Sequence, residues 1–491
     1  MKTTKRIWGS IAAVLTVCAV TLTSVFAATN DWNSFRGNAE NNGITAAAPA
    51  RTAEEAELKW STSLRDDGET WIMKSDPIIL GDSIYIVKGT QLRQYRMADG
   101  SLTASCTLDA GIGYTCRLVA DQNNIYVPMD NAQVEAVSIA SMKKVWISTA
   151  LELEAAEYSM STPTLYNGKI YLQTSDWGSN GTVRCLNTSD GSEVWSYAGG
   201  SFYWGGAVVK NGALIVAGDN GKLLSLNADT GAEIAVLEGF VKVRSSMVLV
   251  DDSVYFTSAD GKLNTVVIHA DGTFGAAKSL SFAAASTSTP AIYNGKAYVG
   301  GNTSDYKGIL AVINLADMTI EQSVSAPKAV QASPLIATGH NGAVFAYFTS
   351  NGNPGALYTM ELGSDESEAR VIYTPAAEKQ SFCNASVIAD RDGTLYYVND
   401  SDTLFAVQAN LSSVSSNASS EVLSQPVSSR ENTEVSSVQP STQTSSFVST
   451  VAGNDTPATG AAGTAAGAAV FFGGALCCVL LVLGKNKRDS E

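Results

Sequence analysis

The sequence predicts an all-β protein, an eight-bladed β-propeller whose blades are four-stranded antiparallel sheets. Short apolar segments with an aromatic or aliphatic centre recur eight times, about every 44 residues, which is the spacing of four-stranded propeller blades. A turn rich in Asn, Asp and Gly precedes most of these segments, and helix-length amphipathic stretches are nearly absent. The segments are interpreted as the second strands of the blades: 84–87, 125–127, 170–172, 214–216, 254–256, 297–299, 344–347 and 395–398.

The turns before these strands support the same alignment. Two-residue hairpin loops need positive φ angles, which Asn, Asp and Gly adopt most readily. Five units carry such a pair just before the second strand: Asn167-Gly168, Asn211-Gly212, Asn294-Gly295, Asn341-Gly342 and Asp392-Gly393. A helical interpretation would place these glycines inside helices, so hairpins are favoured.

The ring is predicted to close through a strand from the N-terminal side. The eighth unit supplies only three strands, at 381–388, 394–398 and 403–407, before a Ser-rich tract begins. The apolar segment 58–62 precedes the first unit, and pairing it as the outer strand of the eighth blade removes both open edges. Trp60 in this segment then takes the blade-docking position that Trp146 and Trp195 take in blades two and three.

Residues 1–27 have the pattern of a signal peptide. Three basic residues are followed by an apolar stretch and by small residues that end at Ala27. The sequence therefore predicts an exported propeller that spans residues 28–410. The alternative is an uncleaved membrane anchor, although the apolar run is short for a membrane span.

The C-terminal part has the composition of a stalk and a membrane anchor. Residues 411–455 are mostly Ser, Thr, Val, Asn and Gln, which predicts a disordered stalk. Residues 461–484 carry no charge and are followed by Lys485, Lys487 and Arg488. This order predicts a transmembrane helix with a basic cytoplasmic tail within the segment 456–491.

A short motif stands directly before the predicted membrane helix. It consists of Thr456, Pro457, Ala458, Thr459 and Gly460. It resembles the Leu-Pro-x-Thr-Gly signal that sortases cut in Gram-positive bacteria, with Thr456 in place of Leu. Covalent attachment to the cell wall and a plain membrane anchor both stay open.

Charge and cysteine content narrow the partners and the chemistry. The net charge of −15 argues against nucleic acid and anionic lipid, because both are bound through Lys and Arg. Two histidines and the lack of any Cys-x-x-Cys pair predict no metal site. Cys106 and Cys116 flank the passage from the first blade to the second and are the candidate pair for a disulfide in an oxidising compartment.

Three stretches carry a family resemblance. They are Asp31 to Asn38 continued by Asn42 to Thr45, Leu186 to Trp195, and Leu226 to Gly231. The first resembles the Trp-x-x-Phe-Arg-Gly opening of the PQQ-like propeller repeat family, and the other two resemble its blade-docking motif. That family includes quinoprotein alcohol dehydrogenases and non-enzymatic scaffolds such as the outer-membrane assembly lipoprotein propeller. The resemblance covers about residues 32 to 407 and implies the fold, whereas a fold alone does not imply a function.

The resemblance also implies what a dehydrogenase of this family would need. Such an enzyme uses an adjacent cysteine pair near the quinone, a Ca²⁺ held by carboxylate and amide, and a catalytic Asp. The only adjacent cysteines here are Cys477 and Cys478, inside the predicted membrane helix. No catalytic residue is assigned and no cofactor is expected, with PQQ and Ca²⁺ as the alternative.

Aromatic and basic residues gather at one predicted face. The loops that lead into the first strands open on the same face as the loops that join the second and third strands. The ligand-binding candidates there are Trp71, Lys74, Tyr114, Arg117, Tyr158, Trp177, Tyr203, Trp204, Arg244 and Phe382. Such a crescent would bind a sugar chain or a peptide. The alternative is that the rings pack between blades, and solvent exposure separates the two.

The sequence therefore predicts a non-catalytic binding or scaffolding propeller displayed on a Gram-positive cell surface. Its expected partner is a surface protein, peptidoglycan or a polysaccharide, and its contact with the membrane runs through one C-terminal helix. The alternative class is a PQQ-dependent or other catalytic propeller oxidoreductase.

Overall fold

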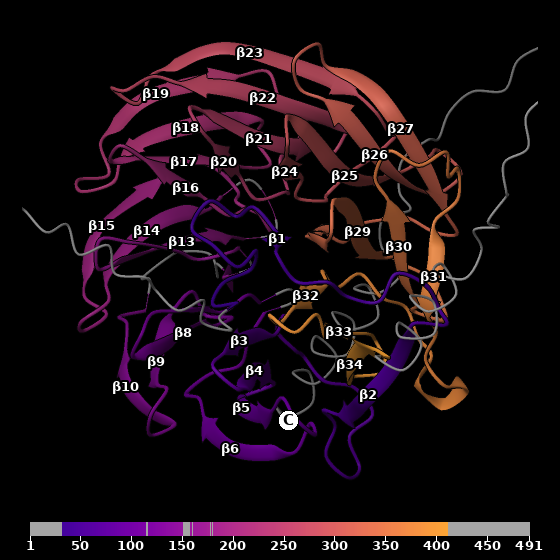
Figure 1. Cartoon of the computed structure of the whole chain (residues 1–491). Coiled ribbons are helices and arrows are strands. Elements are labelled where there is room, and N and C mark those ends of the chain that lie inside the picture. Colours follow the sequence, from indigo (N-terminus) through magenta and orange to yellow (C-terminus); the bar gives the residue numbers. More distant parts are fainter. Residues whose placement is uncertain are drawn as a thin grey trace, which may run out of the picture. The chain divides into compact units, whose positions relative to one another are not determined.

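The computed structural model describes residues 32–113, 116–150, 158–159, 161–176, 178 and 180–410. Eight antiparallel sheets are arranged around a centre as blades (Figure 1), which confirms the predicted eight-bladed propeller. The predicted signal peptide, stalk, sortase-like motif and transmembrane helix lie outside the described residues. In the described part, no helix has the length and apolar composition that a membrane crossing needs.

Blades 1 to 7 follow the chain from an inner first strand to an outer fourth strand, and blade 8 takes its outer strand from the N-terminal side. Blade 1 contains β3 (Ile78–Leu80), β4 (Ser83–Lys88), β5 (Gln91–Arg96) and β6 (Leu102–Thr107), and blade 2 contains β7 (Val119–Ala120), β8 (Asn124–Pro128), β9 (Val134–Ser138) and β10 (Lys143–Ile147). Blade 3 contains β12 (Thr164–Tyr166), β13 (Lys169–Ser175), β14 (Thr182–Asn187) and β15 (Glu193–Ala198), with β11 (Tyr158–Ser159) also paired to β13. Blade 4 contains β16 (Val208–Lys210), β17 (Ala213–Ala217), β18 (Lys222–Asn227) and β19 (Glu233–Glu238).

The remaining blades repeat this order. Blade 5 contains β20 (Val248–Val250), β21 (Ser253–Ser258), β22 (Lys262–Ile268) and β23 (Phe274–Ser281), and blade 6 contains β24 (Ala291–Tyr293), β25 (Lys296–Asn302), β26 (Gly308–Asn314) and β27 (Thr319–Ala326). Blade 7 contains β28 (Leu335–His340), β29 (Ala343–Thr349), β30 (Leu357–Glu361) and β31 (Arg370–Tyr373), with β1 (Ile44–Thr45) added in parallel to β28. Blade 8 contains β32 (Ile388–Ala389), β33 (Leu395–Val398), β34 (Thr403–Ala409) and β2 (Ala56–Ser63), and the 3₁₀ turn η1 (Ala377–Lys379) leads into it.

The hairpin turns have the conformation that the sequence predicts. Asn211 has φ 49° and Gly212 has φ 79° in the turn between β16 and β17, and the Asn-Gly turn of blade 3 repeats this pattern at Asn167 and Gly168. Positive φ at both residues matches the right-handed twist of the flanking strands. The turns therefore fix the register of the first and second strands.

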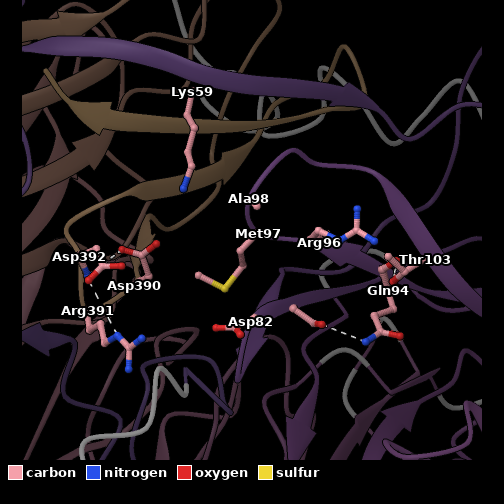
Figure 2. Close-up of a pocket in the computed structure, with 11 residues that line it drawn as sticks. Lys59, Asp82, Gln94, Arg96, Met97, Ala98, Thr103, Asp390, Arg391 and Asp392 are labelled. Atoms are coloured by element: carbon pink, nitrogen blue, oxygen red, sulfur yellow. Dashed lines mark hydrogen bonds and ion pairs between the residues drawn. The ribbon is translucent and has the colours of Figure 1, made fainter.

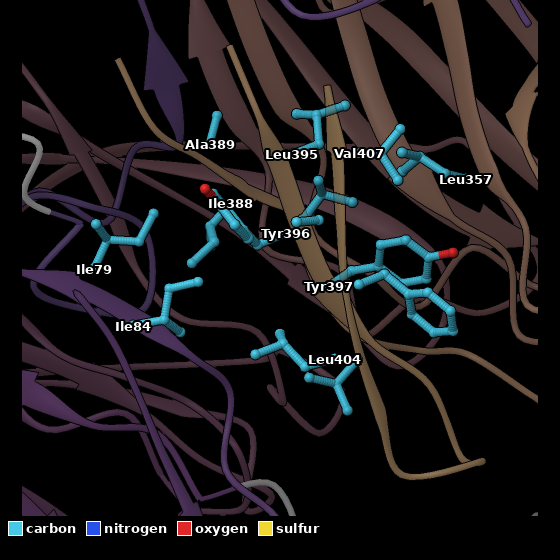
Figure 3. Close-up of a cluster of buried hydrophobic side chains, with 14 of the residues drawn as sticks. Ile79, Ile84, Leu357, Ile388, Ala389, Leu395, Tyr396, Tyr397, Leu404 and Val407 are labelled. Carbon is cyan, nitrogen blue, oxygen red and sulfur yellow. The ribbon is translucent and has the colours of Figure 1, made fainter. Parts of the chain in front are cut away.

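The N-terminal strand closes the ring as predicted. β2 pairs antiparallel with β34 from Ala56 opposite Ala409 to Ser63 opposite Thr403. The eighth blade thus has four strands, and blade 8 joins blade 1 through a shared core of buried side chains (Figure 3). Ile79 and Ile84 of blade 1 face Ile388 and Tyr396 of blade 8 in this core. The first strand of blade 8 is shorter than the predicted 381–388, because only Ile388 and Ala389 form a ladder.

A tryptophan on the fourth strand of three blades packs on a glycine turn of the next blade. In each case the indole Nε1 donates to a backbone carbonyl of that turn at 2.9–3.0 Å, and a side chain on the glycine would lie 2.4–2.6 Å from the indole ring. The three pairs are Trp60 and Gly100, Trp146 and Gly191, and Trp195 and Gly231. Trp60 therefore has the same role between blades 8 and 1 as Trp146 and Trp195 have between blades 2, 3 and 4.

All eight outer strands have an irregularity in their ladder that limits edge pairing. The ladder between the third and fourth strand contains a register shift in every blade. A β-bulge bends the strand and disrupts the regular row of exposed backbone groups, which disfavours pairing with another chain.

The segment before β1 lies at the centre of the ring (Figure 1). Its asparagine side chains donate to backbone carbonyls of the first strands or of the residues just before them: Asn33 to Ala120, Asn41 to Ala207 and Met247, and Asn42 to Ile292. Trp32 bridges to Ile79, and the buried Arg36 donates to the carbonyls of Ser333 and Pro334. We call residues 32–45 the plug, since they contact the first strands, or the residues leading into them, of blades 1, 2, 4, 5, 6 and 7. In the sequence this segment stands out only as a family signature, and its central position was not predicted.

Candidate functional site

The predicted crescent divides into two groups on the face where the chain enters the first strands. Trp71, Lys74 and Phe382 belong to the loops before β3 and β32, where blades 1 and 8 meet. Arg117, Tyr203, Trp204 and Arg244 belong to the loops before β7, β16 and β20. Tyr114 and Trp177 lie outside the described residues, as does the side chain of Tyr158.

The first group combines two exposed rings with an ion-pair cluster. Lys74 Nζ lies 2.9 Å from Asp402 Oδ1 and 3.6 Å from Asp400 Oδ1. The N–H of Asp400 donates to the carbonyl of Phe382 at 2.8 Å, so Phe382 lies beside the Lys74 ion-pair cluster. Trp71 is 54% exposed and Phe382 is 53% exposed. These two rings therefore do not pack between blades. The ion pairs of Lys74 and the hydrogen bond from Asp400 to Phe382 hold the loops that carry them.

The second group is packed more tightly. The Arg117 guanidinium donates from Nε to Asp76 Oδ2 at 3.2 Å, and from Nη1 to Thr162 Oγ1 at 2.9 Å and to the carbonyl of Trp204 at 3.1 Å. The guanidinium also lies 3.6 Å from the ring centroid of Phe35 in the plug. Arg117 therefore connects the plug to the loops of this face. Burial raises the pKa of Asp76, and the positive charge of Arg117 opposes this shift.

Tyr203 and Trp204 stand beside the second arginine of this group. Arg244 makes a two-pronged hydrogen bond to Asp219, with its shortest contact at 2.6 Å, and lies 4.4 Å from the Tyr203 ring centroid. Tyr203 is 8% exposed, so its ring is buried, as expected if the aromatic rings pack between blades. Trp204 is partly exposed. The group presents little aromatic surface to a partner.

The cations of the crescent are already neutralised. Lys74, Arg117 and Arg244 each lie within 4 Å of a carboxylate from a neighbouring loop. A paired cation has little attraction left for an anionic ligand, because the carboxylate screens it at short range. This face therefore suits a neutral or mixed-charge partner better than a polyanion.

A belt of hydroxyl groups connects the residues that precede the first strands of successive blades. Thr162 Oγ1 lies 3.3 Å from Ser246 Oγ, and the Oγ atoms of Thr289, Ser333 and Ser386 each accept the backbone N–H of the preceding blade's belt residue at 3.0 Å. The blade between Thr162 and Ser246 contributes Gly206, where a side chain would lie 2.7 Å from Thr162. This belt was not predicted, although Thr or Ser before Pro at 162, 289 and 333 marks three of its members in the sequence.

The four described cysteines do not form the expected disulfide. Cys106 and Cys116 are free thiols, which corrects the predicted pairing. Their sulfur atoms contact different backbone carbonyls, Cys106 Sγ that of Thr107 and Cys116 Sγ that of Pro128, and both pack in one apolar cluster. Burial raises the pKa of the Cys116 thiol, so it behaves as an apolar core residue.

The residues of this face do not fit a quinone with Ca²⁺. PQQ is a polycarboxylate, and the three cations of the crescent, Lys74, Arg117 and Arg244, already face carboxylates. In the described part of the chain, no three His, Cys, Asp or Glu side chains come together as a potential metal site. The cysteine pair 477–478 lies outside the described residues.

Comparisons with known proteins agree on the fold. The family model described as outer membrane protein assembly factor BamB matches residues 42–202 and 179–417. No curated protein matches the sequence. Among solved structures, quinohemoprotein alcohol dehydrogenase from Comamonas testosteroni has a TM-score of 0.60 at 12% identity, covering 77% of this chain and 80% of that chain. A europium-containing methanol dehydrogenase has a TM-score of 0.59 at 12% identity, covering 74% and 88%. BamB from Moraxella catarrhalis has a TM-score of 0.53 at 14% identity, covering 72% and 99%.

Proposed function

The chain belongs to the family of outer membrane protein assembly factor BamB, and on this premise we propose that it is a non-catalytic propeller that binds a partner protein. The observation that carries the proposal is the exposure of Trp71 and Phe382, whose loops adjoin the Lys74 ion-pair cluster. Exposed aromatic rings on a rigid support are typical anchors of protein interfaces. The central plug and the neutralised cations favour a binding role for this face over cofactor chemistry.

We also propose that the propeller acts outside the cell. A signal peptide at 1–27 would export the propeller, and the segment 456–491 would hold it at the cell membrane or the cell wall, with the stretch 411–455 as a spacer. The propeller would then meet its partner outside the cell. A cell-wall glycan is the second candidate partner, because an exposed indole also stacks on sugar rings.

The double substitution Trp71→Ala and Phe382→Ala is expected to weaken partner binding at least about thirtyfold, since even one hot-spot aromatic contributes about 2 kcal/mol or more. The full-length protein is immobilised and incubated with surface proteins extracted from the source cells, and the retained partner is titrated. Val194→Ala is the matched control, because Val194 is an exposed apolar residue on the outer strand β15. Equal binding by the double variant and the control would refute the proposal. In a parallel incubation with cell-wall fragments, their retention in place of protein would identify the glycan candidate.

The thermal unfolding of the full-length protein is expected to stay unchanged when PQQ and Ca²⁺ are added. A ligand at a hundredfold over its Kd stabilises a folded protein by about 2.7 kcal/mol, so binding would produce a clear rise in Tm. Such a rise would contradict the non-catalytic proposal and favour an oxidoreductase. Addition of Ca²⁺ alone is the control.

A further inference from the structure

A cleft lies where blades 8 and 1 meet at the ring closure (Figure 2). Its turns join first to second and third to fourth strands, so they lie on the face opposite to the loops of the crescent. Its volume is about 510 Å³, in the range of small-molecule sites. Its walls come from three parts of the chain that meet where the ring closes: β2, the first hairpin of blade 8, and two turns of blade 1. The lining residues are Lys59, Asp82, Ser83, Gln94, Arg96, Met97, Ala98, Thr103, Asp390, Arg391 and Asp392.

Several polar groups of this cleft are engaged in structure. Asp390 is buried and accepts the backbone N–H groups of Asp392 and Thr394 and the hydroxyl of Tyr396. Gln94 donates to Ser83 at 2.9 Å. Asp121 in blade 2 likewise accepts two backbone N–H groups of its turn and a tyrosine hydroxyl. Asp390 therefore stabilises a hairpin and is not assigned to ligand binding.

Two charged groups of opposite sign remain available. Lys59 and Asp82 have no ion pair within 4 Å among the described residues, unlike Arg96, which pairs with Asp99 at 3.2 Å. Figure 2 shows the Lys59 ammonium pointing into the cleft, Asp82 lying across from it, and the Met97 side chain between them. Met97 is buried and gives the cleft an apolar floor.

This arrangement is complementary to a small zwitterion. A carboxylate placed at Lys59 and an ammonium placed at Asp82 would satisfy both charges, whereas a simple anion or cation would leave one of them unpaired. An apolar side chain between the two charges would cover Met97, whose thioether adapts to varied shapes. We infer that the seam cleft binds a free amino acid or a short peptide through its two termini.

The site is separate from the proposed protein-binding face. A bound zwitterion would connect β2, which carries Lys59, to blade 1, which carries Asp82 and Met97. Trp60, the next residue after Lys59, already donates to the carbonyl of Met97. Ligand binding would therefore strengthen the contact that closes the ring and raise the Tm, because a ligand that binds only the folded state stabilises it.

Calorimetric titration of the full-length protein with leucyl-leucine tests this inference. Leucyl-leucine is expected to bind, and its methyl ester and its N-acetyl derivative are each expected to bind at least about tenfold more weakly, since each loses one charged contact. Lys59→Met should abolish the preference for the free carboxylate, and Asp82→Asn the preference for the free ammonium. Lys278→Met, on the exposed outer strand β23, is the control and should bind like the wild type.

Two results would overturn the inference. One is the absence of any heat or Tm change with leucyl-leucine and with free leucine at millimolar concentration. The other is equal affinity for the free and the blocked peptides. Because Lys59 and Asp82 lie on different segments and neither forms an ion pair among the described residues, both variants should keep the wild-type Tm without ligand.

Discussion

Replacement of Trp60 by alanine is expected to lower the free energy of unfolding by about 3–5 kcal/mol, the usual effect of removing a large buried aromatic side chain. The indole is 9% exposed, donates to the carbonyl of Met97 at 2.9 Å, and lies 5.9 Å from the ring of Tyr396. It stands on β2, the strand that joins the two ends of the ring. Urea denaturation followed by tryptophan fluorescence and circular dichroism measures the effect.

Trp71→Ala is the matched control, because it makes the same substitution at a residue that is 54% exposed. Its effect is expected to stay within about 0.5 kcal/mol of zero. Trp195→Ala removes the same contact between blades 3 and 4, so it should destabilise the protein about as much as Trp60→Ala does. If Trp60→Ala were no more destabilising than Trp71→Ala, the closure strand would not hold the ring in solution.

The repeated part of the fold could be predicted because its signals are local. Alternating apolar residues and Asn-Gly turns specify hairpins within about ten residues of sequence, and Asn211-Gly212 adopts the predicted conformation. The pairing of 58–62 with 403–407 spans the whole domain. It was predictable only because a three-stranded last blade left one position open.

The position of the plug could not be predicted from local sequence patterns. Asn41 and Arg36 bind backbone carbonyls of distant blades, and every residue has a backbone carbonyl, so no partner is marked in the sequence. The predicted pairing of Cys106 with Cys116 rests on proximity in sequence, whereas in the fold the two thiols are free and contact the carbonyls of Thr107 and Pro128. Long-range polar contacts to the main chain thus leave no pattern from which they could be predicted.

The sequence predicted which aromatic and basic residues lie on the candidate face, but not that carboxylates pair with the basic ones. Arg244 and Asp219 belong to different loops, as do Lys74 and Asp402, and nothing in the sequence pairs them. The structure therefore changes the expected ligand chemistry from a basic crescent to a balanced surface with two exposed rings. Exposure also separates Trp71 and Phe382 from Tyr203, which the sequence treats alike.

Gly231→Ala is expected to destabilise the protein by about 3 kcal/mol. Gly231 has φ +72°, where an L-residue is strained by about 1–2 kcal/mol. In addition, a Cβ atom would lie 2.6 Å from the Trp195 ring, and overpacking of a filled interface costs about 1–3 kcal/mol more. Since the indole hydrogen bond to Ala228 fixes its position, the ring cannot move away without losing that bond. Thermal and urea denaturation measure the change.

Gly212→Ala in the same blade separates the two contributions. Gly212 has φ +79°, close to that of Gly231, but a Cβ atom at this position would have no other atom within 4 Å. This variant should therefore show the backbone strain alone, about 1–2 kcal/mol. The difference between the two variants measures how tightly the tryptophan seats on the glycine turn. Equal destabilisation would mean that the indole yields freely, and the contact shared by Trp60, Trp146 and Trp195 would then contribute little to holding neighbouring blades together.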